Sequence, residues 1–199
     1  QRQMCIRDRN QRGGVQDYYL YGNRLNFTDL QSYKNWFERV KGYTQNVRNS
    51  LEINKEGLEL GYTQPKLVTR GVSAQIGAML ERDLEDHPYF KIFKNVGDVA
   101  SPEDALALQN EVKDYIQNVL NPIYQELYDF LINEYLPESR DTIGISDVPN
   151  GKEWYEYLAR YHTTTNLTPD EIHEIGLREV AKIRACLLYT SDAADDLLC

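Results

Sequence analysis

The chain has 199 residues, of which 41% are apolar and 27% are charged, so it can build a hydrophobic core and does not read as disordered. Its net charge of -9 and the lack of a basic stripe argue against nucleic acid as a partner. No apolar run reaches the roughly 18 residues that a membrane helix needs, so no membrane span is expected.

Three amphipathic helices are predicted in the first 84 residues. Thr28 to Gln31 has the pattern of a capping box and begins the first helix, which Gly42 is expected to end. The second helix runs from Tyr43 to a stop at Gly61, and Pro65 opens the third, which extends to about residue 84.

Residues 85–100 are predicted to form a loop that three aromatic side chains anchor. The aromatic residues are Tyr89, Phe90 and Phe93. His87 lies in the same segment beside acidic residues, and we expect it on the surface. A metal site there would need three or more converging ligands, which the sequence does not indicate.

The second half continues the helical pattern. Ser101 caps a long helix that Asn121-Pro122 is expected to break or kink, and the segment after it ends at Pro137. A loop over 138–150 leads to a helix over 152–162. Because no convincing strand is found, the predicted fold is an all-α array of about seven helices with short to medium loops.

The last helix has the clearest start signal. Thr168 suits the N-cap, Pro169 the first helical position and Glu171 the reciprocal capping-box position. His173-Glu174 matches the first two letters of H-E-x-x-H, in which both histidines bind one zinc ion. The fourth residue after His173 is Leu177, so this zinc motif is incomplete.

No catalytic residue and no metal ligand are predicted within the chain. The paired carboxylates lie at helix ends, and no G-x-S-x-G motif, glycine-rich phosphate loop or nucleophilic cysteine is found. If any residues contact a substrate, the best candidates lie around the turn after residue 161. The candidates for a substrate groove are Tyr155, Tyr157, His162, Thr163, Thr164 and Thr165. The competing interpretation is that the threonine hydroxyls cap helix ends and fix the turn.

Both ends of the chain differ from the rest. Residues 1–9 and 186–199 resemble translated sequencing-adapter read-through of the kind found at the edges of metagenomic fragments, and they contain all three cysteines. We therefore expect residues 10–185 to be a helical domain fragment of a larger protein. With those ends excluded, a disulfide framework or a cysteine zinc site is not expected.

Two segments carry a resemblance to a known family. They are EGLELGYTQPKLV (56–68) and the stretch 120–185, which contains EYLP, HTTT and LTPDEIHEIGLREV in that order. The chain resembles the bacterial family called domain of unknown function 885 over 10–185, most specifically over 134–185.

The resemblance implies a function for a longer parent protein. Members of the family are similar to mostly helical zinc metallopeptidases of the gluzincin kind, with H-E-x-x-H, a Gly-His continuation and a downstream glutamate ligand. Those motifs would follow residue 185, so zinc is expected in the full-length parent and no cofactor in this fragment. The implied partners are the missing C-terminal half of the chain and a peptide substrate, and helix faces made for that half should be exposed.

Two functions therefore remain open. The first is a scaffold and cleft wall of a zinc-dependent hydrolase, inactive alone because the metal-binding motif is missing. The second is a helical module that binds a peptide or protein without catalysis. For a bacterial protein, the sequence leaves the periplasmic or secreted and the cytoplasmic compartments equally open.

Overall fold

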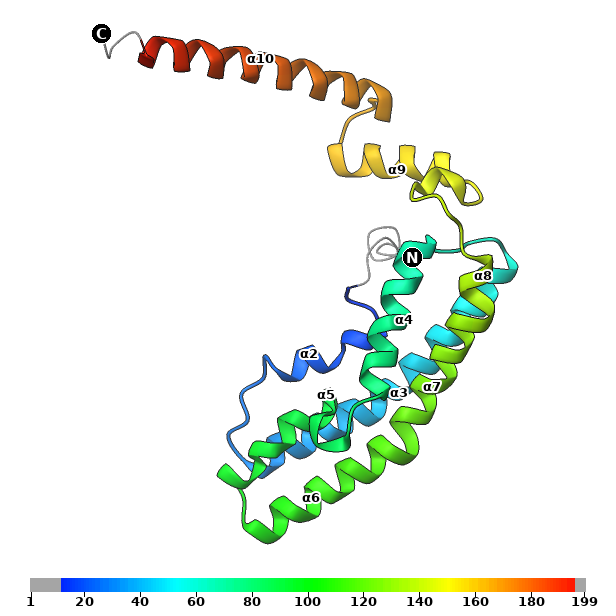
Figure 1. Ribbon diagram of the computed structural model, residues 1–199, viewed down its shortest axis with the longest axis vertical. Helices are drawn as coiled ribbons and strands as arrows, with labels where there is room; N and C mark the ends of the chain where they lie inside the picture. The colour runs from blue at the N-terminus through cyan, green and yellow to red at the C-terminus, as the bar shows by residue number, and fades with distance from the viewer. Residues whose placement is uncertain (1–11, 196–199) are drawn as a thin grey trace. The chain divides into compact units, whose positions relative to one another are not determined.

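A computed structural model describes the backbone of residues 12–195 and the side chains of residues 12–187. The described residues form helices and turns, with one isolated bridge between Pro65 and Arg140, so the all-α prediction is confirmed. The chain divides into two compact units, residues 1–143 and residues 144–199. Figure 1 labels the helices of each unit.

Among the described residues, the longest helix is α3 (Leu30–Glu59), which lies in the first unit. Asp29 caps it: its carboxylate accepts the Ser32 N–H at 2.7 Å, and the Ser32 hydroxyl lies 3.4 Å from the Asp29 N–H. The predicted capping box was therefore wrong by one residue, because Asp29 takes the place assigned to Thr28. Both residue types are suitable N-caps, and spacing alone did not separate them.

Gly42 does not end the first helix, so the two helices predicted over 28–61 are one. A glycine inside a helix costs about 1 kcal/mol. Val40 and Val47 lie on either side of it and are buried, and each such side chain contributes about 1.5–3 kcal/mol. Burial along the helix therefore outweighs the local cost at Gly42.

Gly61 is the true stop of α3, as predicted. Its φ of 77° lies in the left-handed region, and the following Tyr62 N–H donates to the Gly57 carbonyl at 2.7 Å. After a short link, α4 (Lys66–Leu80) begins directly behind Pro65, again as predicted.

The predicted loop 85–100 is a series of short helical turns: η2 (Leu84–Asp86), α5 (Pro88–Lys91) and η3 (Ile92–Asp98). The predicted aromatic anchor is confirmed, because Tyr89, Phe90 and Phe93 are each about 1% exposed. The surface position predicted for His87 was wrong, since this side chain is fully buried. Its neighbours in sequence are polar, but the turn directs the ring inward against Tyr89.

Residues 102–138 form one continuous helical path through five segments. They are α6 (Pro102–Tyr115), η4 (Ile116–Leu120), α7 (Asn121–Phe130), η5 (Leu131–Tyr135) and α8 (Leu136–Glu138). The predicted start of α6 at Ser101 is confirmed, since the Ser101 hydroxyl accepts the Asp104 N–H at 3.1 Å.

Each interior proline of this path follows a π-helical turn. The segment η4 precedes Pro122, and η5 precedes Pro137. A proline donates no N–H and its ring crowds the carbonyl four residues earlier. The wider π turn places the N–H of Asn121 on the carbonyl of Ile116, five residues back, which leaves room for the next residue. Asn121-Pro122 therefore widens the helix without breaking it.

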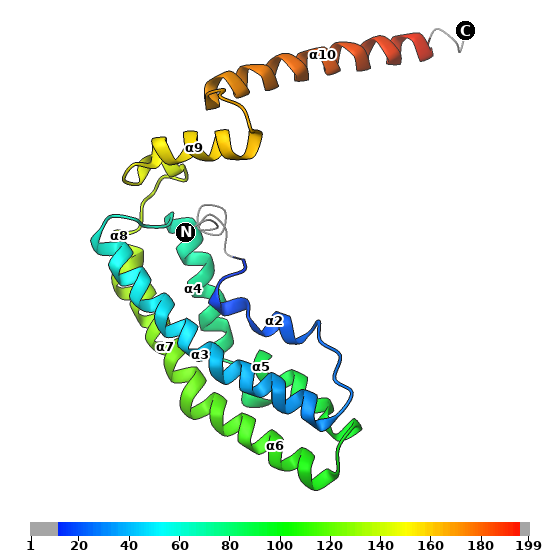
Figure 2. The same cartoon turned by 180° about the vertical axis from the view of Figure 1, so that it is seen from behind.

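The core of the first unit lies between these helices. The segment α7 contacts both α3 and α4, and η3 packs on α6. Both views show α3 running alongside the path of α6 and α7 (Figure 1 and Figure 2). Two short elements, η1 (Val15–Asp17) and α2 (Tyr19–Gly22), lie along the chain before α3, and η1 contacts α3 and α4.

The second unit contains η6 (Ile145–Asp147), α9 (Gly151–Thr163) and α10 (Pro169–Asp195). The helix predicted over 152–162 is thus confirmed within one residue at each end. The segment α10 continues through residue 185. The prediction that 186–199 and 1–9 are foreign to the gene stays a prediction, and residues 1–11 and 196–199 lie outside the described part.

Candidate functional site

The end of α9 and the turn after it hold three of the six predicted substrate-groove residues, Thr163, Thr164 and Thr165. Thr164 adopts a left-handed φ of 56° and donates its N–H to the Arg160 carbonyl at 2.9 Å, which ends α9. The Thr163 hydroxyl donates to the Ala159 carbonyl at 2.8 Å and lies 2.9 Å from the Thr165 hydroxyl. The threonine hydroxyls therefore satisfy backbone groups at the helix end and hold the turn together.

His162, Tyr155 and Tyr157 are exposed on α9. The His162 ring lies 5.1 Å from the Tyr161 ring in an edge-to-face arrangement. Helical geometry places His162 on nearly the same side as Tyr155, seven residues earlier, whereas Tyr157 points about 200° away from Tyr155. Tyr157 instead stacks near Tyr161, with ring centroids 6.2 Å apart. The six predicted residues thus lie on one helix and the turn after it. Tyr155 and His162 lie on one side of α9, however, and Tyr157 lies on another.

The capping box at the start of α10 is confirmed. The Thr168 N–H donates to the Glu171 carboxylate at 2.7 Å, and the Glu171 N–H donates to the Thr168 hydroxyl at 3.2 Å. The Thr168 N–H and the Thr168 hydroxyl both donate to the Glu171 carboxylate, and these two bonds favour its ionised form and lower the pKa of Glu171 below its ordinary value. One turn later, His173 and Leu177 are both exposed.

Apolar side chains in the second unit are exposed to an unusual degree. On α9, Tyr157 is 58% exposed and Tyr161 is 54% exposed. On α10, large apolar side chains are exposed over the last three turns with described side chains. They are Leu177, Val180, Ile183 and Leu187. We call these four residues the α10 stripe. A helix with such a stripe ordinarily buries it against another element.

Zinc does not fit the residues that the structure describes. Within residues 12–187, whose side chains the structure describes, no three histidine, cysteine, aspartate or glutamate side chains lie close enough together to hold a metal ion. His173 faces Leu177 along the helix, where a zinc motif of this kind would need its second histidine. Over the same residues, no helix combines the length and apolar character that a bilayer span requires.

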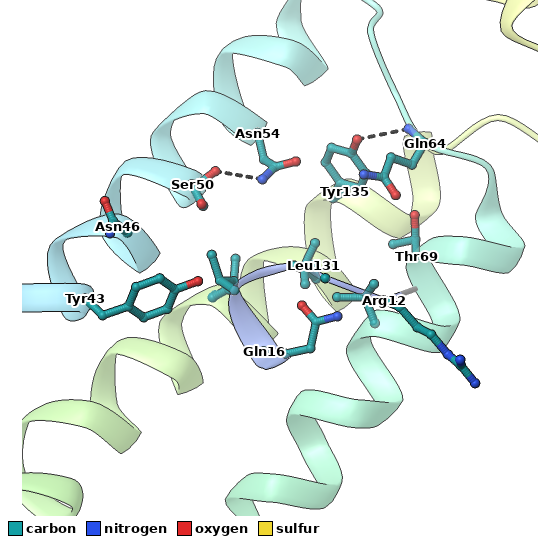
Figure 3. Close-up of a pocket in the computed structure, with 15 residues that line it drawn as sticks. Arg12, Gln16, Tyr43, Asn46, Ser50, Asn54, Gln64, Thr69, Leu131 and Tyr135 are labelled. Atoms are coloured by element: carbon teal, nitrogen blue, oxygen red, sulfur yellow. Dashed lines mark hydrogen bonds between the residues drawn. The ribbon is translucent and has the colours of Figure 1, made fainter. Parts of the chain in front are cut away.

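The first unit contains a cavity that the sequence did not predict. It has a volume of about 410 Å³ and lies where α3 and α4 flank α7 and η5 (Figure 3). Leu127 and Leu131 form an apolar floor, and Val72 of α4 adds to it. Residues 12–16 also line the cavity. The volume is within the range of about 300–1,000 Å³ that small-ligand sites occupy.

One wall of the cavity is a polar stripe on α3. Asn46, Ser50 and Asn54 follow one another at intervals of four residues, so they share a helix face. Asn54 donates its amide to the Ser50 carbonyl at 2.7 Å. This spacing is the signal for the cavity in the sequence, but polar residues four apart on a helix are also typical of a solvated face.

Two further polar groups define the ends of the cavity. The Gln64 N–H donates to the Tyr135 hydroxyl at 3.0 Å, so this end is held rigidly (Figure 3). On the opposite side, the buried Gln16 side chain donates to the Gln75 side chain at 3.1 Å. The polar lining is therefore fixed by contacts between segments that are far apart in sequence.

A buried pair of tyrosines, Tyr89 of α5 and Tyr124 of α7, connects these helices to the segment before α2. The Tyr124 hydroxyl donates to the Val15 carbonyl at 2.7 Å, so the Tyr89 hydroxyl, 2.9 Å away, donates to Tyr124. Burial raises the pKa of both phenols above the ordinary value, so both stay protonated as donors. Tyr89 also lies against the His87 ring, at 5.9 Å between centroids.

Burial lowers the pKa of His87 to about 4, because the charged imidazolium would lose its hydration. The neighbouring Asn121 side chain opposes this shift, and the positive charge of Arg82 adds to it. Neither ring nitrogen has a partner in hydrogen-bonding geometry among the described residues. The ring is therefore neutral at physiological pH.

These features define a helical protein with a polar cavity in one unit and exposed apolar helix faces in the other. The chain belongs to the family described as "Bacterial protein of unknown function (DUF885)", whose profile matches residues 3–193. The predicted family resemblance is thereby confirmed. No curated protein matches the chain.

A solved structure shares the fold. The chain is similar to a protein described as a "putative lipoprotein" from Colwellia psychrerythraea, with a TM-score of 0.79 and 22% sequence identity. The similarity covers 88% of this chain but 31% of the other, so the chain spans about a third of that protein's length.

Proposed function

We propose that this chain is the helical scaffold of a longer, zinc-dependent hydrolase of the metallopeptidase kind. In this proposal, further chain packs on α9 and α10 and supplies the residues that would hold the zinc ion. The observation that carries the proposal is the exposed α10 stripe, in which Val180 and Ile183 are 55% and 57% exposed. The solved relative, about three times as long, supports the existence of such further chain.

In this proposal the chain positions the substrate and takes no direct part in the chemical step. When bound by the further chain, zinc would supply an activated water for hydrolysis of an amide. The residues described here would not touch that water. The rigid turn from Thr163 to Thr165 and the exposed face with Tyr155 and His162 would instead form a wall beside the substrate.

A second function is favoured by the exposed tyrosines of α9. Tyr155, Tyr157 and Tyr161 are between 48% and 58% exposed, and tyrosine is enriched where proteins bind partners. In this alternative the chain is a helical module that binds a peptide or protein and takes part in no catalysis.

Metal content and peptide hydrolysis separate the two functions. We expect one zinc ion per molecule by elemental analysis, and peptide cleavage that a chelator abolishes, for the complete gene product that contains this sequence. For the 199-residue chain alone we expect neither. A complete product without zinc and without cleavage would favour the binding module. Stoichiometric zinc in the chain alone, lost on His162→Ala or His173→Ala, would overturn the scaffold proposal.

A further inference from the structure

The cavity of the first unit presents hydrogen-bonding groups without charge. Among the residues that line it, Arg12 alone carries a formal charge, and its guanidinium points away from the other labelled side chains (Figure 3). The remaining polar groups are carboxamides and hydroxyls, which offer both donors and acceptors. Any ligand enclosed here would meet neutral partners.

Part of this hydrogen-bonding capacity is not used within the protein. Among the described residues, the Asn46 amide and the Ser50 hydroxyl have no hydrogen-bond partner, and no partner is found for Oδ1 of Asn54. These three side chains share the face of α3 that borders the cavity. Figure 3 shows them along one edge, with Gln64 and Tyr135 at one end.

The cavity disfavours charged ligands. Moving an ionised group from water to a site without an opposite charge is unfavourable, whereas a neutral amide recovers its hydrogen bonds from the lining. The floor of Val72, Leu127 and Leu131 suits an aliphatic group attached to that amide.

The aromatic residues of the lining favour an amide over a sugar as the ligand. Sugar rings are commonly held against a free aromatic face, but one face of Tyr43 is covered by Tyr18, stacked at 3.5 Å between centroids. Tyr135 is 3% exposed. We therefore propose that this cavity binds an uncharged small molecule of the carboxamide class, with its amide on the Asn46, Ser50 and Asn54 wall. This site does not depend on the proposed zinc chemistry.

Three probes that share the leucine side chain test the charge requirement on the full chain. N-acetyl-leucinamide is neutral, N-acetyl-leucine carries a carboxylate and leucinamide carries an ammonium group. In isothermal titration or NMR titration at pH 7, we expect the neutral probe to bind at least about tenfold more tightly than either charged probe. Methyl glucoside serves as a neutral sugar probe and should bind more weakly than N-acetyl-leucinamide.

Single substitutions on α3, compared with a control on the same helix, test whether the ligand binds in the cavity. We expect Asn54→Leu and Ser50→Leu each to weaken binding of N-acetyl-leucinamide by about five- to tenfold, since each removes one hydrogen-bonding group from the wall. Asn49→Leu is the matched control, because Asn49 is exposed and pairs with Gln45 on the same helix. Thermal unfolding of each variant confirms that it is folded.

Several results would overturn the proposal. They are the absence of binding by N-acetyl-leucinamide, equal binding of a charged probe, tighter binding of methyl glucoside, and an Asn49→Leu variant as impaired as folded Asn54→Leu and Ser50→Leu variants. Each of them leaves the zinc proposal unaffected, so the two failures are distinguishable.

Discussion

His87 shows at the scale of one residue how position in the fold overrides local sequence. The sequence places it between acidic residues and a proline, which is typical of a surface loop. In the structure its ring is buried beside Tyr89, Asn121 and the base of α5. Nothing in the spacing of neighbouring residues indicates this, because the ring is directed by short turns whose geometry depends on tertiary packing.

The buried state of His87 predicts a pH-dependent stability. Its pKa is about 4 when folded and 6.5 ordinarily, so between these values the unfolded chain binds more protons than the folded one. The contribution of His87 to the free energy of unfolding is fully present above about pH 6.5, and it decreases as the pH falls toward 4. Chemical denaturation should show a loss of about 2 kcal/mol between pH 7 and pH 5 from this residue.

A His87→Phe variant keeps the aromatic ring and removes the titration. We expect its unfolding free energy to change less than that of the wild type over the same pH range. Equal pH dependence in the two proteins would mean that His87 is hydrated or partnered in the folded state.

At the scale of the element, the period of the apolar residues predicted every major helix. Core positions such as Val47 and Ile76 recur at helical spacing, and burial of that pattern dominates the energetics. The errors fall where a local signal competes with packing, as at Gly42. The two π turns were also missed, since Pro122 and Pro137 indicate a disturbance without specifying how the helix accommodates it.

The cap of α3 can be tested with adjacent residues. Asp29→Ala removes the carboxylate that accepts the Ser32 N–H, and we expect it to lower the unfolding free energy by about 1 kcal/mol. Thr28→Ala is the control and should change it by less than about 0.5 kcal/mol. Urea denaturation measures both. A larger effect from Thr28→Ala would indicate that Thr28, and not Asp29, is the N-cap of α3.

At the scale of the whole molecule, the candidate sites were predicted less well than the fold. The capping box of α10 and the turn after Thr163 follow from local rules, and the structure places them as expected. The cavity in the first unit combines α3, α4, α7 and residues 12–16, which are distant in sequence. Only the four-residue spacing of Asn46, Ser50 and Asn54 could have pointed to it, and that pattern is also typical of a solvated face.

The exposed α10 stripe carries the central claim, that further chain covers α10 in the complete protein. Single cysteines at Val180→Cys and, as a polar-face control, Glu174→Cys make this measurable, with the other cysteines replaced by serine. The experiment compares the rate of thiol labelling in the 199-residue chain and in the complete gene product.

Both cysteines should react rapidly in the chain alone, because Val180 and Glu174 are exposed there. In the complete product, we expect labelling at Val180→Cys to slow by at least about tenfold while Glu174→Cys stays reactive, since a covered site reacts only after local opening. Equal labelling rates for Val180→Cys in the two proteins would contradict the claim.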